Sequence, residues 1–284
     1  MITLPEAFEQ EMKQLLGEEE YEAYRKTFDE AVHRGLRVNN GKISTEEFLR
    51  RTDIPLKKVQ WIPNGFYYDE ESCNPAKDAD YYAGLYYLQE PSAMTPASRL
   101  PIEPDDRVLD LCAAPGGKAT ELGSRIGEGG MLLANDISNS RAKALLRNLE
   151  IQGVGRLLVT SEDPEKLVTL YPAFFDKILL DAPCSGEGMF RKESSMLRYY
   201  SENGPEHYVP IQKKLIEQAY QMLAEGGELL YSTCTFSVKE NEEVIAGLLD
   251  AHPDMEVQEI TPGYEGFAPG VSVNLSLIHI SEPT

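Results

Sequence analysis

"DDRVLDLCAAPGGKATEL", residues 105–122, joins a short apolar run to a glycine-rich turn and then to a helical stretch. The apolar run predicts a strand buried on both faces, and the glycines that follow let a ligand approach the backbone closely. The turn is not a GxxxxGK[ST] phosphate loop, because that motif needs Gly and Ser or Thr where this chain has Cys112 and Ala119. Because its glycines are adjacent, it is not a GxGxxG dinucleotide turn either. The stretch therefore predicts a ligand loop of another kind after the first strand.

Apolar runs and helical stretches continue to alternate after this loop. This alternation predicts a parallel sheet covered by helices on both faces, an α/β Rossmann-like fold in which ligands bind at the carboxyl ends of the strands. The further strand candidates are "GMLLAND", "RLLVTSED", "FDKILLDAP" and "GELLYSTCTF", and the helix candidates follow Gly116 or lie at 138–152, 163–171, 209–224 and 238–251.

The first hundred residues have a different pattern. The stretch from Leu4 has helical spacing, Ser44 is placed to cap a short helix, and "VQWIPNGFYYDEE" predicts a strand and a turn. We therefore expect a small mixed α/β domain at 1–100 and a second domain at 101–272.

The end of the chain does not complete the predicted sheet. A sixth strand is predicted at "MEVQEI", residues 255–260, but no seventh strand follows "GFAPGVSV". The final "NLSLIHISEPT" resembles a translated sequencing adapter. We expect residues 273–284 to be a non-native tail. We also expect the domain at 101–272 to be truncated, so that the final strand of its sheet is missing.

Charge and hydropathy limit the classes of partner. The net charge of −20 over 284 residues argues against nonspecific coating of nucleic acid, although a local basic groove is compatible with it. "HRGLRVNNGK", "LRRTDIPLKK" and "FRKESSMLRYY" are the basic clusters, and each is equally compatible with a solvated surface. No apolar run reaches the roughly 18 residues of a membrane span, and the acidic N-terminal segment is unlike a targeting peptide. We expect a cytoplasmic monomer.

Four cysteines are present, and their spacing excludes a simple CxxC zinc motif. We expect no metal, and a reducing cytoplasm disfavours disulfides. Cys184 in "LLDAPCSGEGMFRKE" and Cys234 in "YSTCTF" both follow strand candidates, so the two thiols can face one another at one site. Packing is the better interpretation for Cys73 and for the side chain of Cys112.

Asp136 ends the second strand candidate, about 20 residues after Gly117, which is the offset of an acid that binds ribose hydroxyls. This spacing favours a nucleoside-bearing cofactor. The alternative is that Asp136 caps the helix that begins near Ser138.

Together, "LDLCAAPGGKATEL", "LLDAPCSGEGMFRKE" and "YSTCTFSVKENEEVI" resemble the Sun-type RNA cytosine-5 methyltransferase family. "RGLRVN" and "LQEPSAMTPASRL" resemble its RsmF-like bacterial ribosomal RNA branch. The resemblance implies S-adenosyl-L-methionine as cofactor and methylation of carbon 5 of a cytosine in RNA, with 16S ribosomal RNA or the small ribosomal subunit as the expected partner. It also implies that the domain at 1–100 binds RNA and that the domain at 101–272 is the catalytic domain.

The resemblance also implies roles for individual residues. The ribose-binding acid matches Asp136, with Arg141 nearby, and the adenine-side acid matches Asp163, although Glu162 is adjacent and a helix cap is an alternative for Asp163. The cofactor loop corresponds to Cys112, Ala113, Ala114, Pro115, Gly116, Gly117 and Lys118.

Cys234 matches the nucleophile of the family and Cys184 its second cysteine, which assists release of the product. Asp181 would lie between cofactor and base and stabilise the adduct. Lys118 would hold the cofactor carboxylate, lower the pKa of a thiol or contact the base; a surface lysine is the alternative. The candidates for RNA contact are Arg191, Lys192, Arg198, Tyr199 and Tyr200.

Several other functions fit less of the sequence. An amino-group methyltransferase would have an aromatic residue where this chain has "DAPC", and a DNA cytosine-5 enzyme would use Cys184 as its nucleophile. The glycine spacing and the paired cysteines disfavour a nicotinamide oxidoreductase. A non-catalytic module that binds cofactor and RNA, and a tRNA target, remain alternatives.

Overall fold

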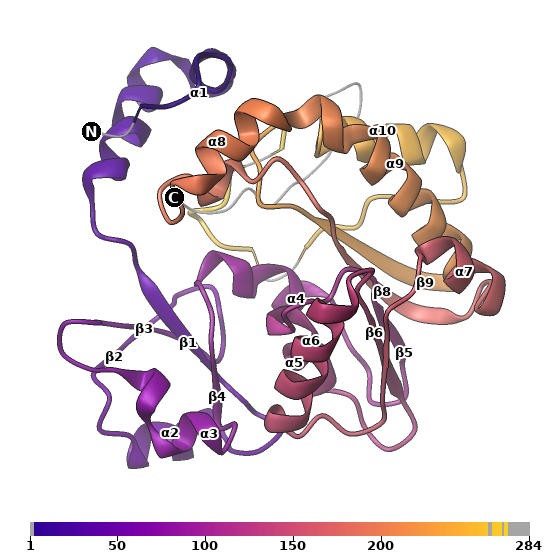
Figure 1. Ribbon diagram of the computed structural model, residues 1–284. Helices are drawn as coiled ribbons and strands as arrows, with labels where there is room; N and C mark the ends of the chain where they lie inside the picture. Colours follow the sequence, from indigo (N-terminus) through magenta and orange to yellow (C-terminus); the bar gives the residue numbers. More distant parts are fainter. Residues whose placement is uncertain (1–2, 261–262, 269, 272–284) are drawn as a thin grey trace. The chain divides into compact units, whose positions relative to one another are not determined.

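The computed structural model of the chain describes residues 3–260, 263–268 and 270–271. The chain folds into two compact units (Figure 1). The larger unit comprises His33–Ala182 and Leu215–Ser232, and the smaller unit comprises Met1–Val32, Pro183–Lys214 and Thr233–Thr284. The borders of these compact units differ from the domain boundary near residue 100 that the sequence predicts. That boundary concerns where independently folding domains begin and end, and it stays a prediction.

The larger unit is built around a five-stranded parallel sheet in the order β7-β6-β5-β8-β9. All five strands and their parallel pairing were predicted from the sequence and are confirmed. The chain leaves the central strand first toward one edge and then toward the other, which puts the switch point at the carboxyl ends of β5 and β8. The strands are β5 (Arg107–Asp110), β6 (Met131–Asn135), β7 (Leu157–Thr160), β8 (Phe175–Asp181) and β9 (Leu223–Ser232).

Helices α4 (Thr95–Arg99), α5 (Gly117–Gly123) and α6 (Asn139–Gln152) stand together beside this sheet (Figure 1). Their apolar side chains and those of the strands form one core cluster, in which Val108, Leu132, Leu145 and Leu149 are fully buried. Helix α7 (Pro164–Leu170) connects β7 to β8. Burial on both faces explains why the central strands β5, β6 and β8 are largely apolar, whereas the edge strands β7 and β9 are partly exposed.

A second, antiparallel sheet of the larger unit has the order β2-β3-β1-β4. Its core contains Leu36, Val38, Phe48, Phe66 and Tyr86. The Ser44 side chain accepts a hydrogen bond from the backbone N–H of Glu47, which confirms it as a helix cap. The elements are β1 (Arg34–Val38), α2 (Thr45–Arg51), β2 (Leu56–Lys58), β3 (Gly65–Tyr68), η2 (Pro75–Lys77), α3 (Ala79–Tyr82), β4 (Tyr86–Leu88) and η3 (Ser92–Met94).

The smaller unit is helical in its described part. Its core joins Phe8 to Phe190 and Tyr200 through ring contacts at 5.0 Å and 6.3 Å. Helix α1 bends at Gly17, where φ is +79°. The elements are α1 (Glu6–Lys26), η1 (Thr27–Asp29), η4 (Glu187–Met189), α8 (Ser195–Glu202) and α10 (Glu242–Ala251), while α9 (Pro205–Met222) begins in this unit and ends in the larger one.

The predicted sixth strand at 255–260 is wrong. These residues belong to no helix or strand, and Val257 is 40% exposed. The alternation of apolar and acidic residues was sufficient for a strand pattern, but a strand also needs a neighbour that supplies backbone hydrogen bonds. The predicted non-native tail lies after Val271, outside the described residues. The prediction that the final strand of the sheet is missing concerns the same segment and stays a prediction.

Candidate active site

The predicted cofactor loop connects the end of β5 to the start of α5. The backbone N–H of Ala113 donates to the carbonyl of Asn135 at 2.8 Å, so the loop is tied to the end of the neighbouring strand β6. Gly116 has φ +112°, a conformation that L side chains rarely adopt, and it immediately precedes the first residue of α5. The sequence therefore needs glycine at this turn for a backbone reason.

Lys118 and Asp181 form an ion pair across the ends of α5 and β8. Lys118 Nζ lies 2.8 Å from Asp181 Oδ2, and the hydroxyl of Ser232 donates to Asp181 Oδ1 at 2.8 Å. The Lys118 side chain is only 16% exposed, which excludes the surface-lysine alternative. The pair therefore fixes the positions of both side chains at the ends of α5 and β8.

Asp136 and Arg141 are joined at the end of β6. Arg141 Nη2 lies 3.2 Å from Asp136 Oδ2 and also donates to the carbonyl of Ala114 at 2.9 Å. The N-cap residue of α6 is Ser138, whose backbone N–H donates to Asp136 Oδ1 at 3.0 Å. Asp136 thus orders the start of α6 without being its cap, and Arg141 connects it to the cofactor loop.

Asp163 occupies the N-cap position of α7. Its Oδ1 accepts a hydrogen bond from the backbone N–H of Glu165 at 2.9 Å, and its side chain is exposed. The neighbouring Glu162 forms an ion pair with Lys166 at 2.7 Å. The structure therefore assigns a helix-capping role to Asp163, and its contact with a cofactor stays a prediction.

Asp110 is a buried acid that the sequence reasoning missed. It ends β5, is fully buried, and neither of its carboxyl oxygens accepts a hydrogen bond of normal geometry within the described part of the chain. Burial, followed by the negative charge of Asp181, raises the pKa of Asp110 to about 8, while Lys118 lowers it. The available signal was an aspartate inside the apolar run "VLDL", since an acid there must be buried with the strand.

The two cysteines meet in the smaller unit, as the sequence predicted. Cys184 Sγ and Cys234 Sγ are 3.2 Å apart, well beyond the roughly 2.05 Å of a disulfide bond. The backbone N–H of Cys234 also donates to Cys184 Sγ at 3.3 Å. The hydrogen bond with Cys234, followed by burial, raises the pKa of the Cys184 thiol well above its ordinary value. Cys184 is therefore protonated at neutral pH, and its S–H is available to donate to Cys234.

Glu240 holds the loop that carries Cys184. The carboxylate of Glu240 is fully buried and accepts hydrogen bonds from the backbone N–H and the hydroxyl of Ser185, the first at 2.9 Å. Gln212 Nε2 donates both to Glu240 Oε1 and to the carbonyl of Pro183, each at 2.9 Å. These bonds fix the backbone on both sides of Cys184.

Glu187 holds the loop that carries Cys234. Its Oε2 accepts hydrogen bonds from the Thr235 hydroxyl and the Phe236 N–H, both at 2.8 Å, and the N–H of Gly188 donates to the carbonyl of Cys234 at 2.9 Å. Burial raises the pKa of Glu187 to about 7. The hydroxyls of Ser185 and Thr235 lie 2.9 Å apart and connect the two loops. Glu187 and Glu240 lie inside the motifs around Cys184 and Cys234, but the sequence analysis assigned no role to either acid.

The candidates for RNA contact divide into buried and exposed side chains. Tyr200 is only 6% exposed and packs edge-on against Phe190, so its assignment to base stacking is wrong. Aromatic residues beside basic ones suggested RNA, but Tyr200 belongs to the core. Arg191 donates to the carbonyl of Thr27 at 3.2 Å, whereas the Arg198 side chain is 88% exposed. Tyr199 is 40% exposed, and Lys192 is half-buried.

Cys112 lies outside the reactive pair. Burial, followed by the charge of Asp110, raises the pKa of its thiol, which makes it a poor nucleophile. The sulfur of Cys73 lies 3.2 Å from the carbonyl of Asp69. Among the helices that the structure describes, none combines the length and apolar character needed to cross a membrane. The same part of the chain contains no cluster of three acidic, His or Cys side chains arranged for a metal.

A parallel sheet with a glycine-rich loop after β5 and acids at or directly after the ends of β5, β6 and β8 is typical of α/β proteins that bind a nucleoside-bearing cofactor. The family model described as 16S rRNA methyltransferase RsmB/F matches residues 97–279, and the model of the N-terminal domain of 16S rRNA methyltransferase RsmF matches residues 4–91. The chain belongs to the RsmB/F methyltransferase family. Enzymes of this family methylate RNA and use S-adenosylmethionine as the methyl donor.

Curated and solved relatives agree with this assignment. "Ribosomal RNA small subunit methyltransferase F" of Erwinia tasmaniensis is 38% identical over 262 residues, which cover 89% of this chain and 55% of the relative. The chain thus spans about half the length of the curated relatives that it matches. A solved methyltransferase homologue from Pyrococcus horikoshii is 31% identical, with a TM-score of 0.74, and the match covers 87% of this chain and 78% of that one.

The solved structure of NSun6 from Pyrococcus horikoshii with SFG shares the fold at 22% identity, with a TM-score of 0.79 and coverage of 96% and 92%. The residues present in this chain fit the family's cofactor. Asp110 offers a buried carboxyl that the backbone N–H of Cys112 approaches without a hydrogen bond of normal geometry, next to a loop that needs glycine, and S-adenosylmethionine brings positive charge. Asp136 offers a second buried acid, at the distance along the chain expected for a ribose ligand.

Proposed function

We propose that this chain binds S-adenosylmethionine and methylates carbon 5 of a cytosine in small-subunit ribosomal RNA through a cysteine adduct. The observation that carries the proposal is the contact between Cys184 Sγ and Cys234 Sγ at 3.2 Å. The chain belongs to a family of RNA methyltransferases and has two thiols in contact at one site. One thiol can form a covalent bond to the base, and the other can help to break it.

The cofactor residues are those at the carboxyl ends of the parallel strands. We assign Cys112 to Gly117 as the loop, Asp136 with Arg141 as the ribose side and Asp163 as the adenine side. Asp110 joins this set as an acid for the positively charged part of the cofactor. The bound cofactor supplies the electrophilic methyl group, and these side chains bind and orient it.

Carbon 5 of cytosine is a weak nucleophile, so Cys234 must first activate it. A thiolate at Cys234 adds to carbon 6 of the base, and carbon 5 then has enamine character and accepts the methyl group. Cys184 Sγ lies 3.2 Å from Cys234 Sγ, so the S–H of Cys184 can donate a hydrogen bond to the attacking sulfur. This division of roles is supported by the raised pKa of Cys184, which leaves that residue neutral.

The same contact supports a second role for Cys184 later in the reaction. The hydrogen bond with Cys234 and the charge of Cys234 are two of the causes that raise the Cys184 pKa. The charge of Cys234 is lost once its sulfur is bonded to carbon 6. Cys184 can then give its proton to water, and its thiolate takes the carbon 5 proton, directly or through water. The electron pair of that C–H bond restores the carbon 5–carbon 6 double bond and expels Cys234 as a thiolate.

Asp181 and Lys118 complete the proposed catalytic set. Paired at 2.8 Å, they present a carboxylate and an ammonium group of defined position at the end of β8. We assign Asp181 to the polar edge of the base and Lys118 to the orientation of Asp181, with contact to the cofactor carboxylate as its further role.

The test uses the chain with labelled S-adenosylmethionine and either small-subunit ribosomal RNA or tRNA, followed by digestion of the RNA to nucleosides. We expect label in 5-methylcytosine from the ribosomal RNA and none with a Cys234→Ala variant. Label only from tRNA would replace the substrate class. Cofactor binding by calorimetry without transfer to any RNA would support the alternative of a binding-only module.

A further inference from the structure

We infer that Arg37, on strand β1, is a positioning residue for the cofactor loop, and that it makes the loop dependent on the small antiparallel sheet. The inference rests on the proposed function, since it takes the loop at 112–118 to bind the cofactor. Arg37 lies in the "RGLRVN" motif, which the proposed catalytic and cofactor-binding sets do not include.

Arg37 is only 1% exposed, although it carries a permanent charge. Its Nη2 donates to the carbonyl of Gly117 at 2.9 Å and to the hydroxyl of Thr120 at 2.8 Å. Its Nη1 forms an ion pair with Glu121, and its Nε donates to Gln89 Oε1 at 3.1 Å. Burying a guanidinium is costly unless its donors are paired, and three of the four acceptors belong to the first two turns of α5.

The contact with Gly117 reaches the loop itself. The Gly117 carbonyl also accepts the Thr120 hydroxyl at 3.0 Å, so Arg37 holds both members of one local hydrogen-bonded pair. A Cβ atom on Gly117 would lie 3.1 Å from Gln89 Nε2 and 3.3 Å from Tyr87 Cε1. The end of β4 therefore packs against the loop backbone, and the guanidinium determines where that backbone lies.

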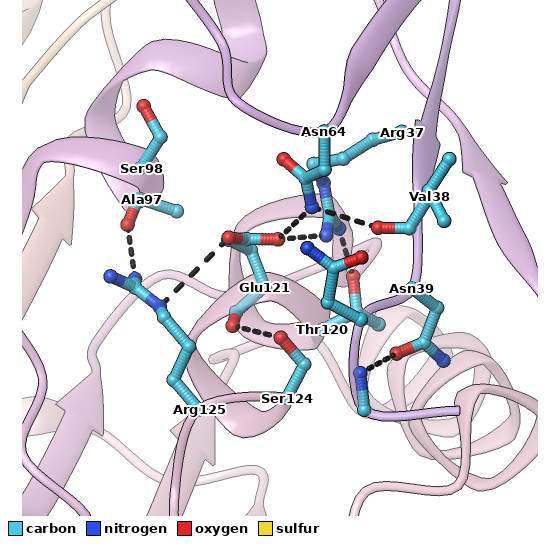
Figure 2. Close-up of polar contacts among 12 residues, drawn as sticks. Arg37, Val38, Asn39, Asn64, Ala97, Ser98, Thr120, Glu121, Ser124 and Arg125 are labelled. Atoms are coloured by element: carbon cyan, nitrogen blue, oxygen red, sulfur yellow. Dashed lines mark hydrogen bonds and ion pairs between the residues drawn. The ribbon is translucent and has the colours of Figure 1, made fainter. Parts of the chain in front are cut away.

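Glu121 extends the connection to a second part of the small sheet. It is 7% exposed, and it accepts a hydrogen bond from Asn64 Nδ2 at 3.3 Å in addition to the ion pair with Arg37 (Figure 2). Asn64 Nδ2 also donates to the carbonyl of Val38 at 2.8 Å. The other Glu121 oxygen lies 3.9 Å from Arg125 Nε. The first turns of α5 are thus joined by buried polar bonds to β1 and to the turn before β3.

A buried polar cluster of this kind has a directional effect that apolar packing lacks. Hydrogen bonds set the position and rotation of the groups they join, and a binding site requires its backbone groups to be held within about 0.5 Å. If Arg37 only stabilised the fold, its replacement would lower the melting temperature and leave cofactor affinity unchanged. If it positions the loop, affinity and loop order change as well.

The test compares Arg37→Lys with Arg99→Lys. Arg99 is a matched control, because it is 7% exposed in the same unit and donates to the Trp61 carbonyl at 2.7 Å. Each variant is measured for its melting temperature, its dissociation constant for S-adenosylmethionine and the hydrogen exchange of residues 112–120 without cofactor. We expect Arg37→Lys to weaken binding about tenfold or more and to speed exchange of the loop. Arg99→Lys should lower only the melting temperature.

A folded Arg37→Lys protein with unchanged affinity and unchanged loop exchange would overturn the inference, and so would equal losses of affinity in both variants. If Arg37→Lys does not fold, Thr120→Val tests the same bond, because valine keeps the shape and removes one acceptor of Arg37. We expect about threefold weaker binding from that variant, and unchanged binding would be the contrary result. Failure of the unmodified chain to bind cofactor would count against the proposed function. In that case, faster hydrogen exchange of the loop in Arg37→Lys, without the same change in Arg99→Lys, would still support the inference that Arg37 holds the loop in place.

Discussion

Asp110 in the larger unit and Glu187 in the smaller unit are both buried acids with raised pKa values, about 8 and about 7, and burial is the largest cause for each. Their surroundings differ. Oε2 of Glu187 accepts hydrogen bonds from Thr235 and Phe236, and only its Oε1 is left without one. Neither oxygen of Asp110 accepts a hydrogen bond of normal geometry from the described residues. Glu187 thus holds the backbone that follows Cys234, whereas both oxygens of Asp110 are open to a ligand that donates hydrogen bonds or carries positive charge.

The same contrast separates the two reactive regions. Charged pairs hold the cofactor loop and its surroundings, with Lys118 bound to Asp181 and Arg37 bound to Glu121. Around the thiols, backbone N–H groups, hydroxyls and the Gln212 amide donate to two buried acids. We therefore expect the loop at 112–118 to adjust its position when a charged cofactor binds. The loops that carry Cys184 and Cys234 are instead held by neutral donors and two buried acids before any ligand binds. The predictions below test this contrast, beginning with the largest effect.

Replacing each cysteine in turn should give opposite results. Cys234→Ala removes the thiolate that attacks the base, so methyl transfer should fall at least about a thousandfold and no covalent adduct should form. Cys184→Ala keeps the nucleophile and loses the group that assists release, so protein bound covalently to RNA should accumulate. Denaturing gels with labelled RNA measure both outcomes, with Cys73→Ala as the control. An adduct that forms with Cys234→Ala and is absent with Cys184→Ala would reverse the two roles.

Asp110→Asn should separate ligand binding from stability. The amide cannot carry the charge that the cofactor attracts, so we expect affinity for S-adenosylmethionine to fall about tenfold. Without cofactor the variant should gain stability relative to the original protein as the pH rises from 4 to 8. The original folded state keeps a proton on Asp110 in that range, while the unfolded state releases it.

Calorimetry and melting curves at pH 5 and pH 8 measure these two effects, and the exposed Asp105→Asn is the control. Unchanged affinity together with a gain in stability would show that Asp110 does not meet the cofactor.

Glu187→Gln should change stability with pH. The carbonyl of the introduced amide can still accept from Thr235 and Phe236. The raised pKa of Glu187 gives a contribution that is complete below the unfolded value of 4.5 and is lost as the pH rises through about 7. The glutamine variant escapes this loss, so it should gain up to about 3 kcal/mol over the original protein between pH 4 and pH 8. Urea unfolding across this range, with the exposed Glu20→Gln as control, measures the gain; parallel curves would contradict it.

The parallel sheet could be predicted from the sequence because its central strands are largely buried and apolar, and because helical stretches alternate with all five strands. Strand β1 could not, because Arg37 interrupts its apolar pattern, and the partner that permits this burial, Glu121, lies far along the chain. The predicted strand at 255–260 had the pattern and lacks a paired neighbour. Local patterns thus identify strands whose burial is uniform, and they miss those that depend on distant charges.

The candidate site divides in the same way. The contact between the two cysteines was predicted from their places after two strands and is confirmed, whereas the roles of Asp136 and the loop at 112–118 stay predictions. The raised pKa values of Asp110 and Glu187 were not predicted, because they follow from burial and neighbouring charges in the fold. Tyr200 was assigned to RNA from its basic neighbours, but its ring contacts Phe8, which no local pattern could indicate.

The smallest expected effect concerns Asp163, for which capping and cofactor binding are separable. Asp163→Ala removes the acceptor for the Glu165 N–H and should cost about 1 kcal/mol of unfolding free energy, whereas Asp163→Asn preserves a cap and should cost little. Asparagine lacks the charge, so we expect it to weaken cofactor binding about threefold. Urea unfolding and calorimetry of both variants distinguish the roles. If the asparagine variant binds cofactor as tightly as the original protein, Asp163 serves α7 alone and leaves the proposed site with Asp110 and Asp136 as its buried acids.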